Sequence, residues 1–276
     1  MPIRLSLPPT LTERLRESDR PLIGLWACAG SPITAEIMAS SGCDWVLLDA
    51  EHSPNGLESV LAQLYAMSAY PVAPLVRPPV GDTVIIKQFL DLGAQNLLIP
   101  MVDTVAQAEE VVRAVHYPVN GVRGVGSALA RSARWNRVDG YLQRAAETIS
   151  LTVQIESATA AENVEAIAAV DGVDALFVGP SDMAASMGRI GQQSHPEVVA
   201  NVLRAIEAGR AAGKPVGVNA FVPADAERYI EAGASFVAVG ADVAMLARQS
   251  EALVDRFIPE GGGDGDAASA SPRGSY

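Results

Sequence analysis

Residues 175–182 read Ala175-Leu176-Phe177-Val178-Gly179-Pro180-Ser181-Asp182. Four apolar residues in succession, without alternation, are typical of a strand that is buried on both faces. The glycine and proline that follow end such a strand. Strands buried on both faces belong to parallel sheets, whose strands are joined through helices. This stretch therefore predicts a parallel α/β fold.

The same pattern recurs on both sides of this stretch. Segments with helical spacing, such as 56–70 and 104–116, separate the apolar runs. Eight strands that alternate with helices predict a (β/α)8 TIM barrel, whose usual length is about 250 residues. The eight predicted strands are 22–26, 45–49, 73–77, 96–100, 151–156, 175–178, 215–219 and 235–239.

A doubly wound open sheet is the alternative fold. That fold often carries G-x-G-x-x-G after its first strand, whereas the first strand here ends Gly24-Leu25-Trp26-Ala27-Cys28. The glycine-rich segment 121–127 has the wrong order and no predicted strand before it. The barrel is therefore favoured, with a long connection, 102–150, after its fourth strand.

Composition excludes several classes of protein. The chain has 276 residues and a formal net charge of −12, which disfavours nucleic acid and anionic membranes as partners. Two cysteines are too few for a disulfide scaffold, and we find no signal peptide or membrane span, so a cytoplasmic protein is expected. We expect one barrel domain over 1–258 and a disordered Gly/Ala/Ser/Asp-rich tail over 259–276.

Two carboxylates end consecutive predicted strands. Glu156 and Asp182 should lie close together at the carboxyl end of the barrel, where TIM-barrel active sites are found. Neighbouring carboxylates repel each other unless one is protonated or a cation lies between them. Oxygen ligands favour a hard ion, Mg²⁺ or Mn²⁺. The alternative is that Asp182 caps the following helix and Glu156 pairs with an arginine.

Three further strand-end residues are candidates. His52, in Asp49-Ala50-Glu51-His52, is placed to act as a general base, with a carboxylate to orient it; the alternative is a solvated loop histidine. Arg77 is placed to hold a carboxylate or enolate oxygen, or else forms a structural salt bridge. Asp91 lies in the last turn of a helix, where the dipole disfavours an anion, although an exposed charge can be tolerated there.

The two lysines separate two carbonyl mechanisms. A Schiff-base enzyme needs a lysine amine in its pocket. Lys87 lies within a predicted helix and Lys214 precedes the seventh strand, at the opposite face. Carbanion chemistry would therefore use a metal as its electron sink. Cys28 and Cys43 are interpreted as packing residues.

Together, the strand-end segments resemble the HpcH/HpaI aldolase family of metal-dependent pyruvate aldolases, from about Gly24 to Phe257. Each segment is a weak signal alone, but their order is specific. The matching segments are Gly24-Leu25-Trp26, Asp44–His52, Val76-Arg77-Pro78, Leu98–Val102, Gly121–Gly126, Val153–Glu156 and Val178–Asp182.

The resemblance implies roles for these residues. Glu156 and Asp182 would bind a divalent metal, Mg²⁺ or Mn²⁺ with Co²⁺ possible. His52 would be the base with Asp49 next to it, and Arg77 would stabilise the enolate. Pyruvate would be bound by Trp26, Gln154, Gly179, Pro180, Ser181 and Asp182.

It also implies a homo-oligomer, usually a hexamer built from dimers with exchanged C-terminal helices. Asp91 would reach the histidine of a neighbouring protomer. Asn219 departs from the aliphatic residue expected at the end of the seventh strand, so the aldehyde preference is open.

The function predicted is reversible retro-aldol cleavage of 4-hydroxy-2-oxo acids to pyruvate and an aldehyde. Alternatives on the same fold are a sugar-acid aldolase and a citryl-CoA-like lyase, although an acidic chain offers few basic groups for CoA. A non-catalytic metabolite-binding barrel is the alternative from another class.

Overall fold

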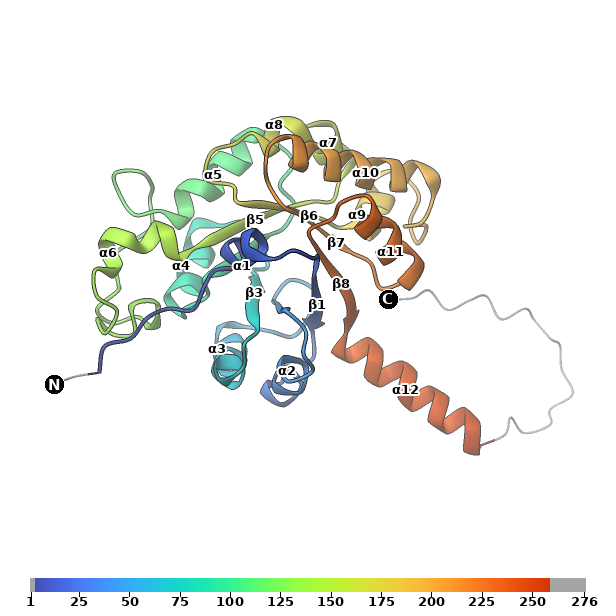
Figure 1. Cartoon of the computed structure of the whole chain (residues 1–276), viewed down its shortest axis with the longest axis horizontal. Coiled ribbons are helices and arrows are strands. Elements are labelled where there is room, and N and C mark those ends of the chain that lie inside the picture. The colour runs from blue at the N-terminus through green and yellow to red at the C-terminus, as the bar shows by residue number, and fades with distance from the viewer. Residues whose placement is uncertain (1–2, 259–276) are drawn as a thin grey trace, which may run out of the picture.

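The computed structural model describes residues 3–258 and contains a closed barrel of parallel strands, β1 to β8, in sequence order (Figure 1). Every neighbouring pair is parallel, and β1 closes the barrel against β8. The predicted TIM barrel is confirmed. The strands are β1 (Leu22–Ala27), β2 (Trp45–Asp49), β3 (Ala73–Arg77), β4 (Asn96–Ile99), β5 (Ser150–Ile155), β6 (Ala175–Val178), β7 (Val216–Asn219) and β8 (Phe236–Ala241).

Helices connect the strands and surround the barrel. The long connection after β4 holds one full helix, one short helix and two 3-10 turns, as its length suggested. The helices are α1 (Leu11–Glu17), α2 (Pro32–Ala39), α3 (Leu57–Ala66), α4 (Thr83–Asp91), α5 (Val105–Val115), α6 (Tyr141–Arg144), α7 (Ala158–Glu162), α8 (Val164–Ala168), α9 (Pro180–Ser186), α10 (Pro196–Ala211), α11 (Pro223–Glu231) and α12 (Asp242–Phe257), with 3-10 turns η1 (Met67–Ala69), η2 (Arg131–Ala133) and η3 (Ala145–Thr148).

Two apolar layers hold the barrel together. Alternate strand residues meet inside it, where the rings of Trp45, Phe177 and Phe236 pack at centroid distances of 5.6–6.2 Å. The other strand residues pack outward against the helices. Strands that face an apolar layer on both sides must be apolar throughout, which explains the continuous runs in the sequence.

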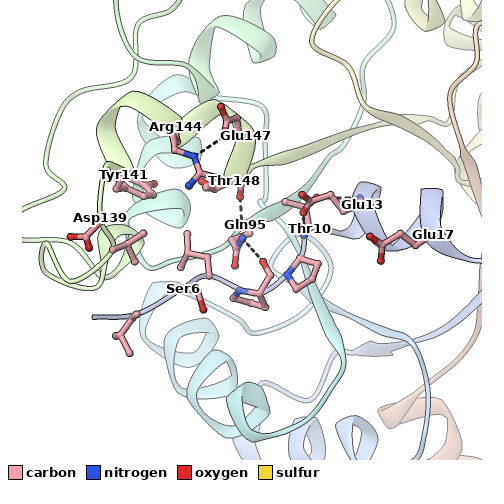
Figure 2. Close-up of a pocket in the computed structure, with 15 residues that line it drawn as sticks. Ser6, Thr10, Glu13, Glu17, Gln95, Asp139, Tyr141, Arg144, Glu147 and Thr148 are labelled. Atoms are coloured by element: carbon pink, nitrogen blue, oxygen red, sulfur yellow. Dashed lines mark hydrogen bonds and ion pairs between the residues drawn. The ribbon is translucent and has the colours of Figure 1, made fainter. Parts of the chain in front are cut away.

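The amino end of the barrel is closed by α1. Leu11 is fully buried, and its backbone N–H donates to Asn96 Oδ1 at 2.6 Å. A reciprocal pair of hydrogen bonds between Thr10 and Glu13 begins this helix, and both residues are seen in Figure 2. The carboxyl end is therefore the open end of the barrel.

The described residues end before the predicted C-terminal tail. The predicted tail, 259–276, lies outside the described residues, so the domain boundary at 258 stays a prediction. Among the described residues, no helix is both long and apolar enough to cross a membrane.

Candidate active site at the carboxyl end of the barrel

A cavity of about 510 Å³ opens at the carboxyl end of the barrel. Residues at or just beyond the carboxyl ends of seven of the strands contribute to its wall, because parallel strands present all their carboxyl ends at one edge. The sequence-predicted residues in the wall are Trp26, Asp49, His52, Arg77, Gln154, Gly179, Ser181 and Asp182.

Arg77 forms the most buried charged contact in this wall. Its Nε donates to Asp49 Oδ1 at 2.8 Å, across the register pair that joins β2 to β3, and its Nη1 lies 2.8 Å from Glu51 Oε2. Burial lowers the pKa of Arg77, but the hydrogen bond and charge of Asp49 and the charge of Glu51 outweigh it and raise the pKa. Its Nη2 atom is buried without a partner in the protein. The structural salt bridge and a free donor are therefore both present.

Glu156 is buried just outside the lining of the cavity, in contact with the lining residues Gln154 and Gly179. Its carboxylate accepts the backbone N–H of Met101 at 2.7 Å and a short hydrogen bond from Gln154 Nε2. It packs against Gly179, where an added Cβ would lie 2.9 Å from Glu156 Oε2. Burial, followed by the charges of Glu51 and Asp182, raises the pKa of Glu156 to about 7. A cation beside this carboxylate would remove the cost of ionising it.

Asp182 lies in the first turn of α9, after Gly179 and Pro180 have turned the chain out of β6. Its side chain is exposed, and no hydrogen bond or ion pair to another described residue involves it. Glu156 likewise has no arginine within ion-pair distance in the described chain. The alternative, with Asp182 as a helix cap and Glu156 paired to an arginine, is not observed.

The donor set fits a divalent cation. Within residues 3–258 no cluster of three or more His, Cys, Asp or Glu side chains could hold a metal by itself. A cation bound at the predicted site would rest on the carboxylates of Glu156 and Asp182 and keep coordination positions for substrate and water. Gln154, which lines the cavity, offers a further buried oxygen, because its Oε1 atom has no hydrogen-bond partner.

Unpartnered buried atoms surround the cavity. Such atoms are rare, because a buried polar atom that lacks a hydrogen bond costs about 1–3 kcal/mol of stability. Several gathered around one cavity indicate a site built for a polar ligand. They are Trp26 Nε1, Arg77 Nη2, Gln154 Oε1 and Asn219 Oδ1.

His52 lies at the rim of the cavity. Its side chain is 63% exposed, and its Nε2 atom lies 3.8 Å from Glu51 Oε2. Asp49 is instead engaged by Arg77 and by the backbone N–H of Glu51. The carboxylate within ion-pair distance of the histidine is thus Glu51, whereas the family resemblance placed Asp49 next to it.

Asp91 does not belong to this cavity within one chain. It ends α4, and its Oδ1 atom accepts a hydrogen bond from the buried Arg123 at 3.3 Å. Its side chain is 29% exposed, so it remains accessible to another molecule. Its predicted contact with a neighbouring protomer stays a prediction.

The sequence reasoning missed one wall of the cavity. Phe221, Val243 and Ala244 form an apolar side, and Phe221 packs edge-on against Trp26 at 6.0 Å. They follow β7 and β8, and the pairing of β8 with β1 that closes the barrel brings them near Trp26. Asn219 was singled out as a departure from the family, and it lines this wall. Neither lysine lines the cavity, as predicted.

A parallel barrel with acidic groups and a buried arginine at its carboxyl end defines the class as a TIM-barrel enzyme. A family model described as HpcH/HpaI aldolase/citrate lyase matches residues 22–248, and the chain belongs to this family. The predicted family is confirmed, as is the prediction of an aldolase, a carbon–carbon lyase. The alternative of a non-catalytic barrel is wrong.

Named relatives agree with this assignment. The chain is 51% identical over 262 residues to a hydroxypyruvate/pyruvate aldolase of Pseudomonas aeruginosa, covering 95% of this chain and 97% of that protein. It is 50% identical over 241 residues to a 4-hydroxy-2-oxo-heptane-1,7-dioate aldolase of Shigella sonnei, covering 87% and 92%. A solved HpcH/HpaI family protein from Burkholderia cenocepacia J2315 has a TM-score of 0.85 and 40% identity over 89% of this chain and 98% of its own.

Proposed function

We propose that this chain catalyses reversible, divalent-metal-dependent cleavage of a 4-hydroxy-2-oxo acid to pyruvate and an aldehyde. The observation that carries the proposal is the pairing of groups across one cavity. Asp182 and Arg77 line the cavity, with an unpartnered carboxylate and a buried, unused Nη2 donor, and the buried Glu156 carboxylate contacts the lining residues Gln154 and Gly179. Pyruvate carries a carboxylate and a 2-oxo group that match such a set.

Each side chain has its own role in the reaction. Arg77 Nη2 donates to the oxygen on which negative charge develops as the C3–C4 bond breaks. His52, at the rim, accepts the proton of the 4-hydroxyl group and returns it in the aldol direction. Trp26 and Phe221 form the apolar wall that keeps water away from C3, the carbon that retains the electron pair of the broken bond. A bound Mg²⁺, Mn²⁺ or Co²⁺, held by Glu156 and Asp182, supplies Lewis-acid polarisation of the 2-oxo group.

The relatives widen the donor range. One is named for hydroxypyruvate and pyruvate, and another for a seven-carbon dicarboxylic substrate. Pyruvate and hydroxypyruvate share a carboxylate and a 2-oxo group, and the polar residues of the cavity wall would bind that shared part. Asn219, with its buried and unpartnered Oδ1, is the residue we assign to aldehyde selection.

The citryl-CoA alternative is disfavoured by the cavity wall. Arg77 is the only lysine or arginine among the described residues that line it. A CoA ester carries several phosphates and needs more basic groups than this. Pyruvate release from sugar-derived 2-oxo acids in the test below would identify a sugar-acid aldolase.

The test measures pyruvate release from 4-hydroxy-2-oxo acids and sugar-derived 2-oxo acids, by coupled oxidation of NADH. We expect EDTA to abolish activity and added Mg²⁺, Mn²⁺ or Co²⁺ to restore it. Asp182→Asn should raise the metal concentration for half-maximal activity at least tenfold. Asp19→Asn removes an equal, exposed charge that does not line the cavity and is the control. Full activity in EDTA, or an Asp182→Asn variant that matches the control, refutes the metal role.

A further inference from the structure

A second pocket lies at the amino end of the barrel, opposite the candidate active site. Its volume is about 150 Å³, and Arg14 of α1, Arg131 of η2 and Arg134 contribute to its wall, together with residues at the starts of β3 and β4. We call it the arginine pocket. No aspartate or glutamate is among the described residues that line it.

The three arginines have weak charge compensation in the described chain: the Arg131 Cζ atom lies 4.7 Å from the centre of the Tyr65 ring, and Asp44 interacts with Arg14 without forming an ion pair. None of them forms an ion pair within residues 3–258. Each instead donates one N–H to a neutral backbone carbonyl: Arg14 to Pro71 at 2.9 Å, Arg131 to Leu92 at 3.0 Å, and Arg134 to Arg131. The Nε atom of Arg14 is buried with no partner. Because a guanidinium has five donors, most of their hydrogen-bonding capacity is unused.

Two of the guanidinium groups lie over the same glycine. A Cβ added at Gly93 would lie 2.8 Å from the Nη1 atoms of both Arg131 and Arg134, so both groups meet over this glycine. Burial, followed by the charge of Arg134, lowers the pKa of Arg131 to about 10. Like charges in contact are unfavourable unless an anion lies between them.

The backbone that presents them is also strained. Arg134, Trp135 and Asn136 adopt positive φ angles of 49°, 53° and 60°, although none is glycine. Consecutive residues of this kind persist only where the surroundings enforce them, and they cluster at ligand sites. This turn brings Arg134 back over Gly93.

The neighbouring surface has the opposite character. A groove on the other side of Gln95 is lined by Glu13, Glu17, Asp139 and Glu147, and its Arg144 is neutralised by Glu147 at 2.8 Å (Figure 2). The whole chain carries −12. Three arginines without an ion pair in one pocket of an acidic protein are therefore a local exception.

We propose that the arginine pocket binds a compact oxyanion, a phosphate or carboxylate group of a small molecule, at a site separate from the catalytic cavity. Guanidinium forks match the oxygens of both groups and bind them through charge-assisted hydrogen bonds. The volume exceeds the roughly 30 Å³ of one water and is below the about 300 Å³ of common ligand pockets, so a small anion fits.

The test titrates inorganic phosphate, and separately succinate, into the full chain by calorimetry at constant ionic strength. Saturable binding of either anion is expected, and the stronger of the two identifies the preferred group. Arg131→Gln/Arg134→Gln should weaken it at least tenfold. Arg14→Gln, which leaves η2 intact, should also weaken it and covers the case in which the double variant fails to fold.

Two control variants locate the site. Arg144→Gln removes an already paired arginine from the acidic groove and should leave binding unchanged, and Arg77→Gln should do the same. Loss of binding in Arg77→Gln alone would place the anion in the catalytic cavity and overturn the proposal. So would the absence of saturable binding by the wild-type chain, or dissociation of an oligomer in Arg131→Gln/Arg134→Gln without any anion binding, which would assign the arginines to a protein contact.

Discussion

Arg77 serves two purposes that a single substitution separates only in part. It neutralises Asp49 and Glu51 in a buried setting, and it keeps one N–H pair free toward the cavity. Breaking a buried ion pair by removing one partner costs about 3–5 kcal/mol. Losing one oxyanion donor costs about 10²–10³ in turnover. Replacing Arg77 should therefore lower both the stability of the fold and the turnover.

We predict that Arg77→Ala lowers turnover by about 10²–10³-fold and also lowers the free energy of unfolding. Arg77→Lys retains the charge but loses the planar fork, so it should fold like the wild type and still lose most of its activity. Initial rates and thermal unfolding of both variants test this. Near wild-type turnover in either folded variant would remove Arg77 from the mechanism.

Glu51 shows why part of the site was not predictable. The strand Trp45–Asp49 was predicted to the residue because every side chain in it is buried. Glu51 lies two residues beyond, in a bend, where neither periodicity nor propensity fixes the direction of a side chain. The contact of Glu51 with Arg77 depends on that bend and on the neighbouring strand, and only the folded chain shows it.

At the scale of elements, the turn from β6 into α9 has the tightest steric requirement in the site. Gly179 lies over Glu156 Oε2 and Gln154 Nε2, with distances of 2.9 and 3.0 Å to an added Cβ. An alanine there must displace the carboxylate or the turn. Gly56 begins α3 with open space around it and offers a matched comparison.

We predict that Gly179→Ala raises the metal concentration for half-maximal activity at least tenfold, because the Glu156 carboxylate shifts. Gly56→Ala should match the wild type in this titration. Metal-dependent activity of both variants is the measurement. Equal metal requirements in Gly179→Ala and the wild type would show that the turn does not position Glu156.

The amino ends of β5 and β6 carry a titrating group. Asp174 accepts the backbone N–H of Leu151 at 2.8 Å, and burial raises its pKa despite that hydrogen bond. The folded state therefore binds its proton more tightly than the unfolded state. Its contribution to stability is complete below the ordinary pKa near 4 and is lost as pH rises through the raised value.

We predict that Asp174→Asn, which keeps an oxygen acceptor but does not titrate, gains stability relative to the wild type as pH rises from about 4 to 7. The exposed Asp171→Asn is the control and should show no such trend. Unfolding midpoints across this pH range are the measurement. A difference between Asp174→Asn and the wild type that does not vary with pH contradicts the assigned cause.

The positions of most strands were predictable from the sequence. Seven of the predicted strands match the observed ones to within one residue at each end, because double-sided burial enforces an apolar run. The eighth extends to Ala241, past the exposed Val239, and a half-exposed end breaks that pattern. The wall formed by Phe221, Val243 and Ala244 required barrel closure, a long-range event that no local pattern encodes.

At the scale of the whole molecule, α12 has no partner for its apolar side within the described chain. It projects from the end of β8 away from the barrel (Figure 1), and Asp242 is the only buried residue in the span Asp242–Phe257. Leu246, Leu253 and Phe257 are 70%, 59% and 73% exposed and lie at helical spacing on one side. An exposed apolar helix of this kind supports the predicted oligomer with exchanged C-terminal helices.

We predict that the wild-type chain is a homo-oligomer, the hexamer that the family resemblance implies, and that Leu246→Glu/Leu253→Glu dissociates it. Charges on this side of α12 would have to be buried without partners in the interface, which costs more than the contact provides. Ile190→Glu changes an equally exposed residue elsewhere and should leave the assembly intact. Light scattering after size-exclusion chromatography gives the masses, and a monomeric wild type would contradict the prediction. Because Asp91 is predicted to reach the catalytic histidine of a neighbour, the dissociated variant should also lose activity while it keeps its fold, which links the assembly to the chemistry.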